Sequence, residues 1–265
     1  MRLRLILAIF LTCSAYSADS FLAGAGSRGL AFLALSPVYG FDAAAANPAV
    51  LPQTGAYQLS YSPMWSDYGI QELSLSLYNA RFPLKPVFNL NGQMHELITS
   101  YFAVMQFRFY QSESVDIGGA FEWSMLQVQK ENATHKGHLS MGFLFHPLEK
   151  MALGVSYLHL AEYPSGFLSQ RMPLFNLALN YQLQNLTLMA GYQKAETLGG
   201  AAALAIQGNF KEILSYGLAW NGSNEMLSAN LSFFWRHYQF RQMAGWHRYL
   251  GLIPVWSIEY QDTAH

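Results

Sequence analysis

Two residues that together could do nucleophilic chemistry, His138 and Ser140, lie close together in the segment GHLSMGFLFH. A histidine that accepts the proton of a serine hydroxyl makes that hydroxyl a nucleophile. Residues two apart share one face of a β-strand, and the alternate residues Leu139, Met141 and Phe143 define an apolar opposite face. No acidic or amide residue that would orient the histidine can be assigned from the sequence. We therefore favour two polar wall residues over a hydrolase site, and we predict no catalytic residue.

The other histidines do not have the spacing of metal ligands. They are His95, His135, His146, His159, His237, His247 and His265. The single cysteine, Cys13, lies in the apolar leader described next, so thiolate chemistry and disulfides are not expected. We predict no metal and no cofactor.

The first seventeen residues have the pattern of a secretion signal. Arg2 and Arg4 precede an apolar run over 5–11, and Ala15–Tyr16–Ser17 forms a small-x-small cleavage site. The sequence therefore predicts a signal peptide over residues 1–17, which is removed on export.

The composition is too apolar for an ordinary water-soluble surface. Only 12% of the residues are charged and 52% are apolar, whereas soluble domains carry about 25% charged residues. Beyond the signal, no segment approaches the roughly 18 apolar residues that a membrane helix needs. A closed β-barrel is the other route across a bilayer. The balance of 15 basic and 16 acidic residues gives no electrostatic basis for binding nucleic acid.

Alternation of apolar and polar residues predicts the strands of such a barrel. The pattern is clearest over 71–80, 114–125, 173–183 and 225–235. It is weaker over 56–64, 98–109, 137–147, 150–160, 185–193, 201–210, 213–221 and 253–260. The fold class is thus all-β, a transmembrane antiparallel β-barrel of about twelve strands, with fourteen possible.

The side that faces lipid follows from the same pattern. Outward residues include Leu75, Leu179 and Leu231, and inward residues include Ser76, Asn180 and Ser232. A secreted soluble β-sandwich or lipocalin-like barrel also alternates, but its polar face would carry Lys and Glu rather than Ser and Gly. Aromatic residues recur near the expected strand ends, as in membrane girdles. We therefore predict an outer-membrane location, and a narrow or plugged lumen with few ion pairs.

The segment before the first strand carries a further pattern. It reads AGSRGLAFLALSPVYGFDAAAANPAVLP and combines a run of small residues, an Asp-Ala pair and an Asn-Pro-Ala turn. The residues are Gly24, Gly26, Gly29, Ala31, Ala34, Asp42, Ala43, Asn47, Pro48 and Ala49. This segment resembles the N-terminal segment of FadL-like outer-membrane proteins, which include long-chain fatty-acid transporters and the PorV/PorQ proteins of type IX secretion.

The resemblance implies a plug, or hatch, that folds into the barrel. It divides the chain into a plug over 18–55 and a barrel over 56–265. The plug and turn residues would be Gly26, Gly29, Asp42, Asn47, Pro48 and Ala49. The short chain and the small-residue lumen favour a PorV/PorQ-type platform in protein secretion. A FadL-like conduit for hydrophobic molecules is the alternative, and a barrel lipid hydrolase is the third. The expected partners are outer-membrane lipid and either secretion-system proteins or a hydrophobic ligand.

Connector lengths conflict with a count of twelve strands. Long connectors are expected over 81–97, 126–136, 161–172 and 241–252, and outer-membrane barrels keep short turns on the periplasmic side. With twelve strands the N-terminal segment would begin on the long-loop side. Either one early strand is missed, or the long connectors face the periplasm. We interpret Phe82–Leu90 as a proline-broken loop, and Arg236, Arg241 and neighbouring aromatic residues as an interfacial girdle.

Overall fold

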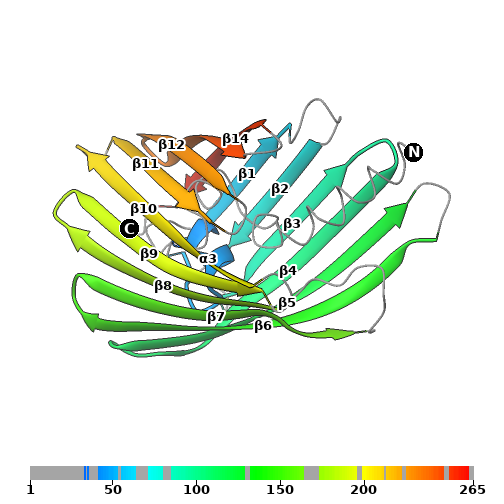
Figure 1. Cartoon of the computed structure of the whole chain (residues 1–265), viewed down its shortest axis with the longest axis horizontal. Coiled ribbons are helices and arrows are strands. Elements are labelled where there is room, and N and C mark those ends of the chain that lie inside the picture. The colour runs from blue at the N-terminus through cyan, green and yellow to red at the C-terminus, as the bar shows by residue number, and fades with distance from the viewer. Residues whose placement is uncertain are drawn as a thin grey trace.

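The barrel is complete in a computed structural model, which describes residues 33, 35, 41–52, 55–63, 71–79, 85–128, 132–163, 173–195, 199–211, 213–222, 225–247 and 251–262. Within these residues fourteen antiparallel strands form one closed barrel. Each strand pairs with its neighbours in sequence, and the last strand pairs with the first, as Figure 1 shows. Closure leaves the sheet without an exposed edge.

The strands vary in length and are longest on one side of the barrel. They are β1 (Ala56–Ser62), β2 (Gln71–Tyr78), β3 (Val87–Met94), β4 (Ile98–Gln111), β5 (Val115–Val128), β6 (Thr134–Leu148), β7 (Met151–Tyr163), β8 (Leu174–Leu183), β9 (Leu186–Ala195), β10 (Gly199–Phe210), β11 (Leu214–Asn221), β12 (Met226–Trp235), β13 (Tyr238–His247) and β14 (Gly251–Gln261).

Apolar side chains cover the outside of the barrel and polar side chains line the inside. Along β2 the exposed fraction falls from 37% at Leu75 to 1% at Ser76, and along β12 it is 50% at Leu231 and 5% at Ser232. The predicted facing of the strands is therefore confirmed. A water-soluble barrel has the opposite arrangement, so this one is built for an apolar surrounding.

Two strands were missed from the sequence. Strand β3 lies in the region predicted to be a proline-broken loop, and β13 lies in the region assigned to the interfacial girdle and the long connector after it. Both predictions were wrong, and the barrel has fourteen strands rather than about twelve. In β3 the inward residues Asn89 and Asn91 and the glycine Gly92 are types that also favour turns.

The corrected count resolves the conflict over the connectors. We call the end where β1 begins and β14 ends the near end of the barrel. Five of the six connectors between described strands at this end have two or three residues, the exception being 79–86, whereas the opposite, far end carries the longest connector, 164–173. Missing an early strand was therefore the right explanation. By the short-turn rule the near end corresponds to the periplasmic side.

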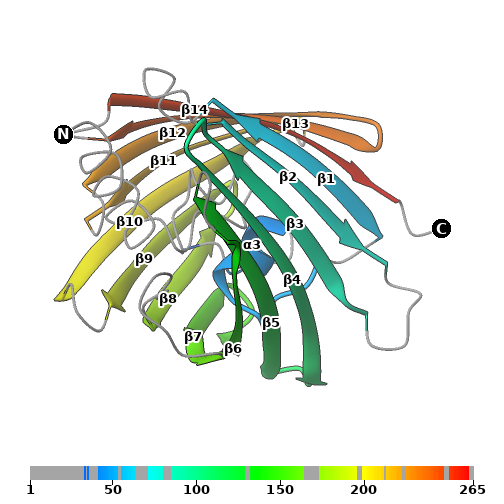
Figure 2. The same ribbon diagram turned by 90° about the vertical axis from the view of Figure 1, so that its right-hand side faces the viewer.

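A short helix, α3 (Phe41–Ala46), lies inside the barrel before β1. Figure 2 shows it surrounded by strands rather than stacked on their outer surface. It has the sequence FDAAAA, and its small alanine side chains let the backbone approach the wall closely. Among the described residues no helix has the length and hydropathy to cross a bilayer.

Candidate functional site

The Asn-Pro-Ala turn follows α3 directly and is buried in the lumen. The backbone N–H of Asn47 donates to the carbonyl of Ala43 at 3.0 Å and so closes the last turn of the helix. The backbone N–H of Ala49 donates to the side-chain Oδ1 of Asn47 at 2.9 Å. This Asx-type bond, together with the fixed φ of Pro48, holds the turn in one shape.

The same asparagine side chain fastens the turn to the barrel wall. Its Nδ2 donates to the carbonyl oxygen of Phe143 at 2.9 Å and to that of Val155 at 3.3 Å. Phe143 and Val155 are register partners on β6 and β7. Next to them, the Ser156 hydroxyl donates to the carbonyl of Ala46 at 3.1 Å. Asn47 therefore bonds both its own turn and two adjacent strands.

A glutamine on β4 holds the opposite side of the segment. The Nε2 of Gln106 donates to the carbonyl of Ala44 at 2.9 Å and to that of Val50 at 3.2 Å. These oxygens come from α3 and from the chain after the turn. The segment is thus hydrogen-bonded to three strands, with side-chain donors from β4 and β7 and a backbone acceptor on β6.

Three inward glycines make room for this contact. A Cβ added to Gly118 would lie 2.1 Å from the Pro48 carbonyl oxygen, and one added to Gly142 would lie 2.0 Å from the Asn47 Oδ1. A Cβ on Gly154 would lie 2.4 Å from the Leu35 side chain. We call these three residues the glycine seat. Glycine is required here because the plug backbone at Gly118, and the Asn47 and Leu35 side chains at Gly142 and Gly154, occupy the space of a Cβ.

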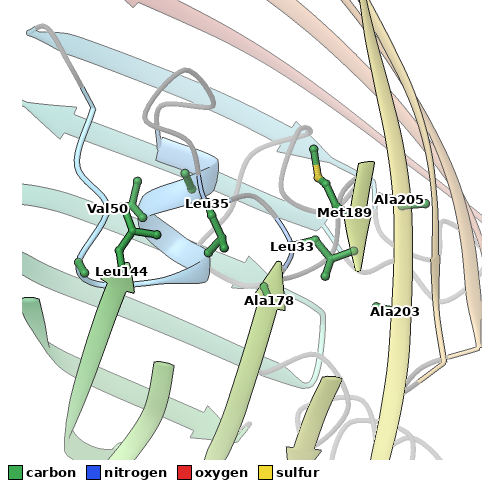
Figure 3. Packing of buried hydrophobic residues seen from close by; sticks show 11 residues of the cluster. Leu33, Leu35, Val50, Leu144, Ala178, Met189, Ala203 and Ala205 are labelled. Carbon is green, nitrogen blue, oxygen red and sulfur yellow. The ribbon is translucent and has the colours of Figure 1, made fainter. Parts of the chain in front are cut away.

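Across β8 to β11 the segment instead contacts small apolar side chains. Leu33, Leu35 and Val50 pack in one cluster with residues of this wall and with Leu144. Figure 3 shows Leu33 directed toward the strands that carry Ala178 and Ala203. We use the name alanine wall for Ala178, Met189, Ala203, Ala205 and Ala219.

A second apolar contact lies at the near end. Phe41 of α3 and Leu51 pack with Ala56, Tyr78 and Val87 at the ends of β1, β2 and β3. Phe41 is fully buried. This contact places the beginning of α3 against the strands that follow the segment in sequence.

The predicted plug and turn residues are partly described. Asn47, Pro48 and Ala49 lie together in the lumen, and Asp42 belongs to α3. Gly26 and Gly29 lie outside the described residues, as does the signal peptide over 1–17.

The polar lining of the lumen includes ion pairs between charged side chains. Its ion pairs are Arg108–Asp116 at 3.5 Å, Lys136–Glu162, and Arg241–Glu259 at 3.1 Å. In the described part of the barrel these three pairs agree with the expectation of few ion pairs. Arg241 was assigned to an interfacial girdle, but it points inward and is 6% exposed. Arg236, by contrast, lies over the ring of Trp235 at 5.3 Å and fits that assignment.

A bulge in β7 brings a histidine into this polar lining. The register between β6 and β7 shifts at Ser140. Three residues of β7, Leu158, His159 and Leu160, lie opposite this single residue. His159 has φ of 55°, and both it and Leu158 are buried. The backbone N–H of His159 donates to the Ser140 hydroxyl at 3.0 Å. The bulge thus interrupts the strict alternation and directs two consecutive side chains inward.

The two inward histidines stand among carboxylates. His138 Nδ1 is 3.9 Å from a Glu162 oxygen, and His159 Nε2 is 3.8 Å from a Glu122 oxygen. The imidazole rings lie with centroids 5.2 Å apart. His138 and Ser140 both belong to the lumen wall, as the sequence predicted, so this pair does not face lipid. In the described part of the chain, no group of three or more His, Cys, Asp or Glu could hold a metal.

Comparison with known proteins places this barrel among solved channels. A Pseudomonas aeruginosa FadL homologue aligns with 90% of this chain and 98% of its own, with a TM-score of 0.60 at 11% identity. The two proteins therefore share their fold. The CymD monoaromatic hydrocarbon channel aligns with 92% of this chain and 98% of its own, with a TM-score of 0.59 at 11% identity.

Sequence comparison alone identifies no relative. No protein-family model matches the chain, and no curated protein matches it. The predicted FadL-like barrel is thus supported at the level of the fold. The narrower PorV/PorQ branch is not distinguished by these likenesses and stays a prediction.

Proposed function

We propose that the protein is an outer-membrane channel for hydrophobic small molecules, with an N-terminal segment that obstructs the lumen. The observation that carries the proposal is the docked Asn-Pro-Ala turn, which is hydrogen-bonded to β4, β6 and β7 inside a closed barrel. The apolar outside of the barrel supports the membrane location.

The alanine wall supports an apolar cargo. It supplies four alanines and a methionine inside the lumen, in one apolar cluster with the plug residues Leu33 and Leu35. A hydrophobic molecule that replaces these leucines keeps the wall out of water, so exchange conserves the buried apolar area. The fold likeness to a hydrocarbon channel agrees with this cargo.

The secretion-platform hypothesis is the weaker candidate. It rests on the resemblance of the segment before β1, which FadL-like transporters share. A platform would bind its partner through surface loops, whereas the contacts described above lie inside the lumen. The lumen contacts favour a conduit.

Uptake by cells tests the proposal. The lipopolysaccharide leaflet slows hydrophobic solutes, so Gram-negative cells producing this protein should take up labelled toluene faster than cells with an empty vector. Unchanged uptake, with the barrel shown in the outer membrane by heat-modifiable gel migration, would refute the conduit.

Removal of the plug tests the obstruction. A variant lacking Phe21–Ala46 should still insert and should conduct small ions in planar bilayers, whereas the full chain should be nearly closed. If the full chain conducts as well as the deletion variant, the segment does not close the lumen.

A further inference from the structure

We infer that the cargo of the proposed channel is a neutral amphiphile, a molecule with a hydrocarbon body and a hydroxyl or amide group. This inference rests on the proposed function and specifies its substrate class. It comes from a feature of the lumen that a purely hydrocarbon cargo does not explain. That feature is a pair of buried amides on the strands opposite the alanine wall.

Gln58 on β1 and Asn89 on β3 point into the lumen and are 1% and 3% exposed. Neither oxygen nor nitrogen of either amide has a hydrogen-bond partner among the described residues. The register places Gln58 opposite Ser76 and Ser76 opposite Asn89, so the two amides flank one hydroxyl in a single row. An unsatisfied buried amide is costly, so this row calls for a polar occupant.

The chemistry of the amides selects the kind of occupant. Each amide offers two N–H donors and one carbonyl acceptor. A hydroxyl or an amide can both accept from and donate to such a pair, whereas a carboxylate accepts only. A hydrocarbon does neither. The row therefore matches a group that carries both a donor and an acceptor.

The charges around the row also disfavour an anion. Glu259 is the register partner of Gln58 on the other side, and its carboxylate is 3.1 Å from Arg241. Beyond Asn89 the same row continues through Val104 to Glu122. On the described inner face, the cations that form ion pairs are Arg108, Lys136 and Arg241, and each is paired with a carboxylate. An anionic head group would therefore lie near carboxylates whose cations are already engaged.

The alanine wall supplies the complementary half of the site. Strands β2 and β9 are seven strands apart in either direction around the closed barrel of fourteen, so the amide row and the alanine wall stand on opposite sides of one lumen. In this structure Leu33 lies against the wall (Figure 3), and Leu35 belongs to the same apolar cluster. A hydrocarbon body would take their place, with its polar group directed across the lumen toward Gln58 and Asn89.

Equilibrium binding to the full chain in nanodiscs tests the inference. The probes are 1-decanol, decane and decanoate, each corrected for its partition into empty nanodiscs. We expect decanol to bind about tenfold more tightly than decane, the factor given by one net hydrogen bond of about 1.4 kcal/mol. Decanoate should bind more weakly than decanol.

Near-isosteric variants locate the head group. In Gln58→Met and Asn89→Leu the preference for decanol over decane should fall to about twofold or less, while decane binding is retained. Asn209→Leu removes an amide at the exposed near-end rim and should leave the preference unchanged. Heat-modifiable migration verifies that each variant folds.

The outcomes separate this inference from the proposed function. Equal binding of decanol and decane, or tightest binding of decanoate, overturns the neutral amphiphile and leaves the hydrophobic conduit standing. A decanol preference that survives in both lumen variants also overturns it. If neither decane nor decanol binds above empty nanodiscs, the proposed function fails.

Discussion

The plug meets two different surfaces inside one barrel. At the glycine seat plug atoms enter space that wall side chains would occupy, and directional hydrogen bonds from Asn47 fix the position of the turn. At the alanine wall, leucine side chains lie on small apolar groups with no direction to satisfy. The first surface defines one geometry, and the second accepts any apolar group of suitable size. The strands that anchor the plug thus differ from those where a cargo molecule would replace plug side chains.

Filling the glycine seat should have the largest effect. Gly118→Ala and Gly142→Ala place a methyl group about 2 Å from plug atoms, so the turn must leave its seat. Planar-bilayer conductance should rise toward that of the variant lacking Phe21–Ala46. Gly55→Ala is the control, because its Cβ would have no neighbour closer than 3.7 Å. Closed channels in both seat variants would contradict the assigned anchoring.

An arginine should destabilise the barrel more on the lipid-facing side of a strand than on its lumen-facing side. Leu179→Arg places a cation on the lipid face of β8 and should cost about 2–4 kcal/mol of stability near the bilayer midplane. Asn180→Arg places it in the lumen, where the cost should be smaller. The same contrast is expected for Leu75 against Ser76 and for Leu231 against Ser232. Refolding titrations in lipid vesicles measure the difference, and equal costs would reject the facing of these strands.

Changing the chemistry of the anchor without its size should have a moderate effect. Asn47→Asp keeps an acceptor for the Ala49 N–H but removes the donor to Phe143 and Val155. The free energy of docking the turn into the lumen should become less favourable by about 1–3 kcal/mol. Hydrogen exchange at the Val50 amide should accelerate accordingly. Asn209→Asp at the exposed rim is the matched control, and protection that stays the same in both variants would count against the anchor.

A substitution that conserves size at the alanine wall should have the smallest effect. Leu33→Met conserves volume and apolar character, so its cost should stay below about 1.5 kcal/mol. Hydrogen exchange of the segment measures this cost too. A loss as large as that of Asn47→Asp would show that the wall is also shape-specific, and the distinction between the two surfaces would disappear.

The barrel and its facing could be predicted because strand alternation is a local property. Leu75 and Ser76 are assigned to opposite faces by their spacing alone. Strand β3 was missed because prolines precede it and its inward residues are asparagines, which favour turns. Strand β13 was missed because Arg241 suggested an interface, although its partner Glu259 lies on the neighbouring strand.

The site could not be predicted in full, because its geometry depends on how neighbouring strands are aligned. That register cannot be read from the composition of the strands. Glycines within strands indicate close backbone approach, and Gly118 and Gly142 carried that signal. Their pairing opposite one another appears only once β5 and β6 are aligned. The bulge that turns His159 inward has no comparable mark in the sequence. The resemblance identified the Asn-Pro-Ala turn, but not the carbonyl oxygens that receive it.

The hydrogen bonds of Asn47 also set an order of assembly. The turn is made early in synthesis, yet its partners Phe143 and Val155 follow 96 and 108 residues later. No surface exists to receive it until β6 and β7 have paired. Strand β1 begins only a few residues after the turn and must meet β14, the last strand, to close the seam. The turn therefore stays undocked until β6 and β7 have paired, and the closing of β1 on β14 encloses it.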